Sequence, residues 1–345
     1  MKILVVTDLY PVSENEKGTP RTIYNFVKCW KQMGHEVRVI KPNFLLNSFL
    51  RWKPFYKSGI YGDVENINYF FPFWGNVKNK IKTEFNPDIV VAHMPSGILF
   101  ADKLGLPFVA AVHVSDIEVL TKPLYKLHFK PRLEKAYRHA NRIAARSDVL
   151  KKKFLKLYPE FENKTFTAYS GVDGAVLRTW SNNKKIKVLT CGKFIKRKNI
   201  DKVIKACDKF ENIELTVIGE GKENLRKLSD KPIFTGQIPH DKVIEKMKNS
   251  DIFILPSVNE TFGMVYLEAL ASGCITVCRR GDGIDGIIED GVNGFLCDDV
   301  DEVLNRILSY EDKNKILENA YNTALEYSEM SAAENYINYL AEIKN

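Results

Sequence analysis

Short apolar runs alternate with segments of helical spacing along the whole chain. In the first half the strand-like runs lie at 2–7, 35–40, 88–93, 107–113 and 141–145. In the second half they lie at 185–192, 213–221, 232–236, 251–256, 274–279 and 294–297. Between them, segments such as 22–33 repeat their apolar positions every three to four residues. This alternation predicts an α/β fold with doubly wound parallel sheets.

The chain is long enough for two such sheets. Its 345 residues exceed the usual size of one domain, and the strand-helix alternation restarts after 169–185, where Gly, Asn and Ser cluster. No close sequence repeat links the halves. We therefore expect one domain at 1–170, a second at 171–325, and an amphipathic helix at 326–345.

One stretch, 251–273, organises the second half. Its first five residues form a buried strand, 256–261 form a polar loop, and 263–272 form a helix that ends before Gly273, a C-cap candidate. The helix therefore begins at the carboxyl end of a strand, where open parallel sheets bind their ligands. Its free amide groups and its dipole favour an anion such as a phosphate.

Two carboxylates, Glu260 and Glu268, lie eight residues apart in this stretch. Glu260 precedes the helix, and Glu268 lies in its second turn, from which helical side chains lean back toward the amino end. Both can face one pocket, where one accepts hydrogen bonds from a sugar and the other from a ribose. The spacing is equally compatible with two solvated acids, one in a loop and one on a helix surface.

The sequence of 256–273, PSVNETFGMVYLEALASG, resembles the E-x7-E signature of glycosyltransferase family 4. Members of this family are retaining nucleotide-sugar transferases with the GT-B fold, in which two Rossmann-like domains face a cleft. The resemblance implies that Glu260 binds sugar hydroxyls and that Glu268 holds the ribose. It also implies donor contacts from the start of the helix, at Phe262, Gly263, Met264 and Val265.

A basic loop at 192–198 follows the first strand of the second half. It contains Lys193, Lys196, Arg197 and Lys198, a charge run that is ordinarily a solvated surface. The family has a glycine followed by a basic residue, and a lysine five positions later. Gly192, Lys193 and Lys198 match that spacing, which implies that both lysines neutralise the donor diphosphate. Lys193 stands where Arg is commoner, so it keeps the charge but loses bidentate contacts.

Other family motifs are weaker. Gly18 follows the first strand, Gly219 belongs to a glycine turn near the nucleotide, and Ile238 lies in the GQI segment whose backbone often contacts the base. His113 ends a strand, and the family has a histidine there, near the donor sugar. A lone histidine is more often structural. Asp282, in a glycine-rich loop, stands where the family usually has Gly.

The resemblance implies a retaining transfer of a hexose or N-acetylhexosamine, with UDP favoured and GDP-mannose second, to a glycan or lipid-linked acceptor in cell-surface polysaccharide synthesis. Lys193, Lys198 and the helix start would stabilise the departing diphosphate. We expect no metal and no cofactor, and we identify no nucleophile. The triplet Asp299-Val300-Asp301 begins a helix, so we interpret it as an N-cap. A nucleotide-sugar epimerase of the same fold, or a non-catalytic nucleotide-sugar-binding protein, stays open.

We expect a cytoplasmic protein, with association at the inner face of the cell membrane as one interpretation of its basic residues. No signal peptide or membrane-length apolar run is recognisable, and six cysteines without a CxxC pair indicate reduced thiols. Residues 1–170 hold 27 Lys and Arg against 15 Asp and Glu, while the remainder is net acidic. Cations and aromatic residues interleave at 44–74, with a second basic run at 122–156. They suit an anionic membrane surface, or else an acceptor pocket with a solvated face; nucleic acid is not expected.

Overall fold

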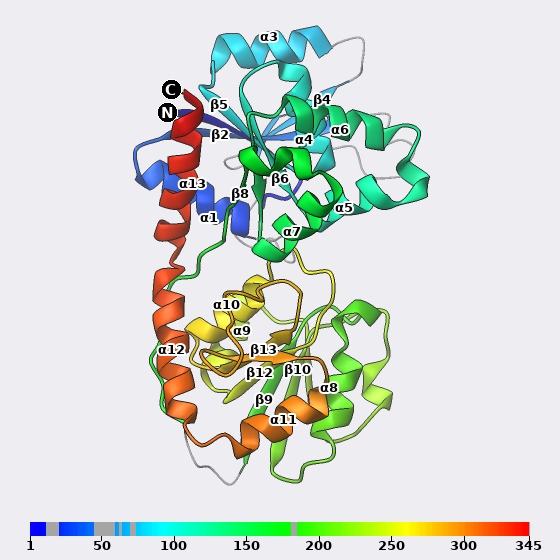
Figure 1. Ribbon diagram of the computed structural model, residues 1–345, viewed down its shortest axis with the longest axis vertical. Helices are drawn as coiled ribbons and strands as arrows, with labels where there is room; N and C mark the ends of the chain where they lie inside the picture. Colours follow the sequence, from blue (N-terminus) through cyan, green and yellow to red (C-terminus); the bar gives the residue numbers. More distant parts are fainter. Residues whose placement is uncertain (12–20, 45–58, 62–63, 70–73, 181–184, 345) are drawn as a thin grey trace. The chain divides into compact units, whose positions relative to one another are not determined.

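The computed structural model describes residues 1–11, 21–44, 59–61, 64–69, 74–180 and 185–344. The chain divides into two compact units, each with its own sheet (Figure 1). The first unit comprises Met1–Tyr169 and Ala332–Asn345, and the second comprises Ser170–Ser331. The prediction of two Rossmann-like, doubly wound sheets is therefore confirmed.

The sheet of the first unit has the strand order β3-β4-β2-β1-β5-β6-β7-β8. Its strands are β1 (Lys2–Val6), β2 (Glu36–Phe44), β3 (Gly59–Tyr61), β4 (Val64–Tyr69), β5 (Ile89–His93), β6 (Phe108–Val112), β7 (Arg142–Ala145) and β8 (Thr165–Thr167). All neighbouring strands are parallel except β3 and β4. β5 and β6 are buried along their whole length, as expected for unbroken apolar runs whose two faces are covered by helices.

Helices and short 3-10 turns connect these strands. The helices are α1 (Thr22–Gln32), α3 (Trp74–Glu84), α4 (Met94–Leu104), α5 (Val114–Thr121), α6 (Phe129–His139), α7 (Asp148–Leu157) and α13 (Glu329–Lys344), and the 3-10 turns are η2 (Pro123–Tyr125) and η3 (Pro159–Lys164). The end of the chain packs on its beginning: the Trp30 indole N–H donates to the Ala333 carbonyl over 3.1 Å, and the Tyr336 ring meets Trp30 edge-on. α13 thus completes the core beside α1.

The sheet of the second unit is parallel throughout, in the order β11-β10-β9-β12-β13-β14. Its strands are β9 (Ile186–Cys191), β10 (Ile213–Ile218), β11 (Ile233–Gly236), β12 (Ile252–Leu255), β13 (Ile275–Arg279) and β14 (Phe295–Cys297). Its helices are α8 (Ile200–Cys207), α9 (His240–Lys248), α10 (Met264–Ala271), α11 (Val300–Ser309) and α12 (Lys313–Glu326), with 3-10 turns η4 (Lys196–Lys198) and η5 (Leu225–Lys227). The chain builds outward from β9 to β11 and then returns to β12. The order therefore reverses between β9 and β12, where open sheets of this type bind ligands.

The sequence analysis did not predict β3, β4 or β8. β4 carries polar residues between its apolar ones, and β3 and β8 are only three residues long, so none gives an apolar run. The strand pair lies inside 44–74, the stretch interpreted above as a membrane-facing segment. Glu65, Val64 and Ile67 in β4 are buried, and the remaining aromatic and basic residues at 45–58 and 70–73 lie outside the described residues. In the part of the chain that the structure describes, we find no helix with the length and apolarity needed to cross a bilayer.

Candidate active site

The loop between β12 and α10 is held at both ends. The Tyr266 hydroxyl, from the first turn of α10, donates to the Leu255 carbonyl at the end of β12 over 2.7 Å. Gly263 precedes the helix with φ +93°, and a Cβ atom there would lie 2.5 Å from the Tyr266 ring, so no other residue fits. Gly273 is left-handed after the last turn, and its N–H donates to the Leu270 carbonyl, which confirms the predicted C-cap.

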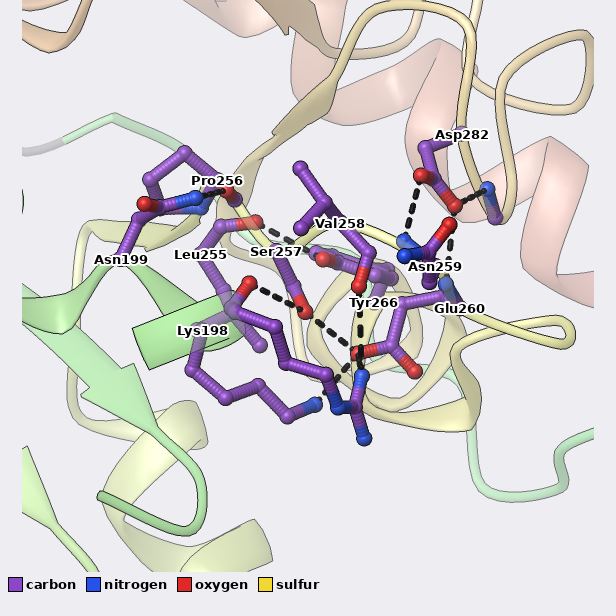
Figure 2. A network of polar contacts seen from close by, with 12 residues as sticks. Lys198, Asn199, Leu255, Pro256, Ser257, Val258, Asn259, Glu260, Tyr266 and Asp282 are labelled. Atoms are coloured by element: carbon purple, nitrogen blue, oxygen red, sulfur yellow. Dashed lines mark hydrogen bonds and ion pairs between the residues drawn. The ribbon is translucent and has the colours of Figure 1, made fainter. Parts of the chain in front are cut away.

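Glu260 lies in this loop and contacts three donors, although burial works against its charge (Figure 2). The Lys198 Nζ and Ser257 Oγ atoms each lie 2.5 Å from its Oε1 atom, and Arg197 Nη1 lies at 3.1 Å. Burial favours the protonated carboxyl, but Lys198, Ser257 and Arg197 outweigh it and hold the pKa of Glu260 below its ordinary value. All three donors converge on one oxygen, and Oε2 takes part in none of these contacts.

Asp282, from the loop after β13, fixes the backbone that carries Glu260 (Figure 2). Its buried carboxylate accepts the N–H of Asn259 over 2.6 Å and the N–H of Glu260 over 2.9 Å. It also accepts the N–H of Gly283 over 2.8 Å. Asn259 has φ +58°, a left-handed conformation that the local hydrogen bonds stabilise. Asp282 was noted in the sequence only as a departure from the family's glycine, and its positioning role was missed.

Lys198 and Glu268 both lie near the carboxyl end of β9. A Cβ atom on Gly192 would lie 3.6 Å from the Lys198 Cδ atom, so the lysine stem runs over this glycine. Burial, and after it the charge of Glu268, raises the pKa of the Cys191 thiol to about 12 against the opposing effect of Lys198. The structure therefore places Lys198 beside Gly192, and both Lys198 and Glu268 act electrostatically on Cys191.

Glu268 has a partner that the sequence analysis did not identify. The His240 Nε2 atom, at the first residue of α9, lies 2.9 Å from the Glu268 Oε1 atom. α9 follows the GQI segment, in which Ile238 is half-buried. The contact therefore links the predicted ribose ligand to the segment predicted to contact the base. Nothing in the sequence connects these two residues, which are 28 positions apart.

The predicted glycine turns cluster at the same edge of the sheet. The Gly219 N–H donates to the Gly236 carbonyl over 3.0 Å. A Cβ atom on Gly219 would lie 2.0 Å from the Gly192 carbonyl oxygen, so only glycine allows the ends of β9 and β10 to approach so closely. Lys193 is exposed and forms no ion pair with the described residues, unlike Lys198. Gly18 lies outside the described residues.

His113 belongs to the first unit, at the end of β6. Its Nε2 atom lies 3.2 Å from the Nδ1 atom of His93, and its backbone N–H donates to Asp116 over 2.9 Å. Burial, followed by the charge of Arg146, lowers the pKa of His113 to about 3, so the imidazole is neutral at neutral pH. It therefore supplies no positive charge to a ligand. His93 and the buried Asp116 were not predicted from the sequence.

The Asp299-Val300-Asp301 triplet has the capping role expected for it. The Asp299 side chain accepts the Glu302 N–H over 3.1 Å at the start of α11, and Asp301 pairs with Lys209 over 2.7 Å. Among the described residues, no three His, Cys, Asp or Glu side chains form a group able to hold a metal ion. The prediction that the N-cap is Asp299 is confirmed, and the absence of a metal stays a prediction.

The site therefore combines three chemical capacities at one sheet edge. Lys198 and the amide groups at the start of α10 offer positive charge to an anion. Glu260 and Glu268 offer carboxylate oxygens to hydroxyl groups. The glycines at this edge have no side chain, so they leave backbone groups accessible to a ligand beside the charged residues.

Two family models match most of the chain. Residues 178–326 match the model for glycosyl transferases group 1, and residues 17–175 match that for glycosyltransferase family 4. The first match contains Glu260, Glu268 and Lys198, and the second contains His113.

Individual proteins are also similar to this chain. The chain is 25% identical over 328 residues to sulfoquinovosyl transferase SQD2 of Arabidopsis thaliana, a match that covers 84% of this chain and 63% of SQD2. It is 30% identical over 117 residues to the lipopolysaccharide core biosynthesis glycosyltransferase LpsE of Rhizobium meliloti, covering 32% of this chain and 34% of LpsE. The crystal structure of Anabaena Alr3699/HepE in complex with UDP-glucose superposes with a TM-score of 0.74 at 17% identity, covering 99% of this chain and 100% of that one.

Proposed function

Because this chain belongs to the glycosyltransferases of these two family models, we propose that it moves a hexose or N-acetylhexosamine from a UDP-sugar to a glycan or lipid-linked acceptor, with retention at the anomeric carbon. The observation that supports this proposal most directly is the ion pair between Lys198 and Glu260, which lies just before the start of α10 and beside Gly192 and Gly219. A cation for a diphosphate and a carboxylate for sugar hydroxyls are what such a donor requires. The UDP-glucose complex of HepE, which shares this fold, supports UDP as the nucleotide.

Each side chain has a distinct part in the proposed reaction. Negative charge develops on the diphosphate as the bond to the sugar breaks, and Lys198, with the amides of Met264 and Val265, stabilises it. Arg197, which lies 3.1 Å from Glu260, can add to that charge. Glu260 offers Oε2 to a sugar hydroxyl, while Glu268 binds the ribose. Lys193 is exposed, so it is accessible to a donor and would help Lys198 to neutralise the diphosphate.

The cations at this site make a bound metal unnecessary in the proposal. They neutralise the diphosphate by themselves. His113 is neutral and lies against His93, so in this proposal it would be near the donor sugar as an uncharged group. We assign no nucleophile, and retention then follows from attack by the acceptor on the face that the diphosphate leaves.

The acceptor belongs to cell-surface polysaccharide synthesis in this proposal. LpsE, to which part of the chain is similar, acts in lipopolysaccharide core biosynthesis according to its name. The excess of basic residues at 1–170 supports an acceptor presented at an anionic membrane surface on the cytoplasmic side.

The decisive experiment incubates the protein with a panel of UDP- and GDP-sugars and measures release of the free nucleoside diphosphate. We expect release from one UDP-sugar, and loss of that release in Lys198→Ala. Conversion of the nucleotide sugar to an isomer without release would instead indicate an epimerase. Binding of a nucleotide sugar without either reaction would indicate a non-catalytic binding protein.

A further inference from the structure

The connection between α5 and α6, residues 122–132, exposes its apolar side chains to an unusual degree. Leu124 is 83% exposed and Leu127 is 84% exposed, the highest values for large apolar side chains among the described residues. Phe129, also exposed, meets Tyr125 edge-on with ring centroids 6.0 Å apart. Single exposed apolar side chains are common on protein surfaces, but three within six residues form a cluster that calls for a partner.

The segment that carries these exposed side chains is anchored at both ends. Leu120 before it and Leu133 after it are buried in the core. Between them, Pro123–Tyr125 form the 3-10 turn η2, in which the Lys126 N–H donates to the Pro123 carbonyl over 3.1 Å. Figure 1 shows this connection at the outer edge of the first unit. The turn therefore presents the leucines outward in a fixed arrangement.

Basic residues surround the leucines. The segment 122–132 contains Lys122, Lys126, Lys130 and Arg132 and no Asp or Glu. Lys122 pairs with Glu118, and Lys130 lies 3.8 Å from Glu134. Lys126, between the two leucines, and Arg132 form no ion pair with the described residues. Uncompensated positive charge thus stands beside exposed apolar surface.

We propose that residues 122–132 form a docking element for an anionic lipid bilayer. Leucine side chains can enter the boundary between headgroups and acyl chains while lysine and arginine side chains stay at the phosphates. This element deepens the proposed function, because a lipid-linked acceptor would bring the enzyme to such a surface. The docking itself requires neither donor nor acceptor. It also narrows the second basic run of the membrane hypothesis, 122–156, to a segment whose side chains the structure describes.

The test measures co-sedimentation of the full chain with vesicles of phosphatidylcholine, with and without phosphatidylglycerol, at low and high salt. The wild-type protein should bind the phosphatidylglycerol vesicles at low salt and release at high salt. Leu124→Ser with Leu127→Ser should lower the partition coefficient about tenfold or more, since two leucines lose their burial in lipid. Lys126→Gln with Arg132→Gln should lower it mainly on the anionic vesicles.

A matched control carries Leu177→Ser and Leu325→Ser, two leucines of the second unit that are 57% and 51% exposed. It should bind as the wild type does, and thermal unfolding should show that all variants are folded. Unchanged binding of the Leu124/Leu127 variant, an equal loss in the control, or no binding by the wild type would overturn the proposal. Release of nucleoside diphosphate from the donor, measured without vesicles, should be the same in wild type and the Leu124/Leu127 variant. A failure of docking and a failure of the proposed transferase activity are therefore separate results.

Discussion

Removing the charge of Glu260 should affect nucleotide binding and turnover in opposite directions. Glu260→Gln keeps the size of the side chain but releases Lys198 and Arg197, whose nitrogens lie 2.5 and 3.1 Å from Oε1. The freed cations then face the diphosphate without competition. Turnover should fall because the carboxylate no longer accepts a hydrogen bond from the sugar. Loss of a residue that only binds the donor would instead lower both the nucleotide affinity and the turnover.

The size of the effect follows from the geometry. Two unit charges about 4 Å apart attract by about 4 kcal/mol at an effective dielectric constant near 20. The Lys198 and Glu260 side chains are each 13% exposed, so desolvation of both offsets part of that attraction. We expect a coupling of about 2 kcal/mol. Release of the lysine should tighten binding of the nucleoside diphosphate about tenfold, which corresponds to about 1.4 kcal/mol.

A double-mutant cycle measures this coupling. It compares urea unfolding of the wild type, Glu260→Gln, Lys198→Met and the double variant, while calorimetry gives the affinity for UDP. Glu211→Gln is the control, because Glu211 is exposed and precedes β10 at the opposite edge of the sheet. Zero coupling, or UDP binding that weakens in Glu260→Gln, would refute the reasoning.

The same ion pair predicts a pH dependence of stability. The pKa of Glu260 is lower in the folded protein than its ordinary value, so folding favours the charged carboxylate. Its contribution to the free energy of unfolding is present above the ordinary carboxyl pKa and is lost as the pH falls through the folded value. Wild type should therefore lose more stability on acidification than Glu260→Gln does.

Three further predictions concern the rest of the site. Asp282→Asn should lower the free energy of unfolding by about 1–3 kcal/mol and lower turnover, because an amide cannot accept the N–H groups of both Asn259 and Glu260 with the same strength. The control is Asp298→Asn, which removes an exposed acid paired with Arg280. Equal effects of the two substitutions would contradict the prediction. Glu268→Ala should weaken UDP binding by about 1–3 kcal/mol with a smaller effect on turnover, and calorimetry that shows unchanged affinity would remove Glu268 from the ribose site. Chelation with EDTA should leave turnover intact, and activity lost in EDTA and restored by magnesium or manganese would show that the lysines do not act alone.

The sequence by itself determined the fold class and the local structure of the site. Strands such as β5, β6 and β12 are recognisable because burial on both faces requires unbroken apolar runs. The helix after β12 is recognisable because its ends have local chemical signals, of which Gly273 is one, and the Asp299 cap is local in the same way. β4 was missed because its polar residues interrupt the apolar pattern.

Only the tertiary structure decided which side chains meet. Lys198 is 62 positions from Glu260, Asp282 is 22 positions beyond Glu260, and His240 is 28 positions before Glu268. Lys198, Glu260 and Asp282 follow β9, β12 and β13, which are neighbours in the sheet although β10 and β11 intervene in the chain. Strand order depends on the packing of helices against the whole sheet, and no local signal encodes it. The partners of Glu260 are therefore set by the sheet, while its place before the helix is set by the sequence.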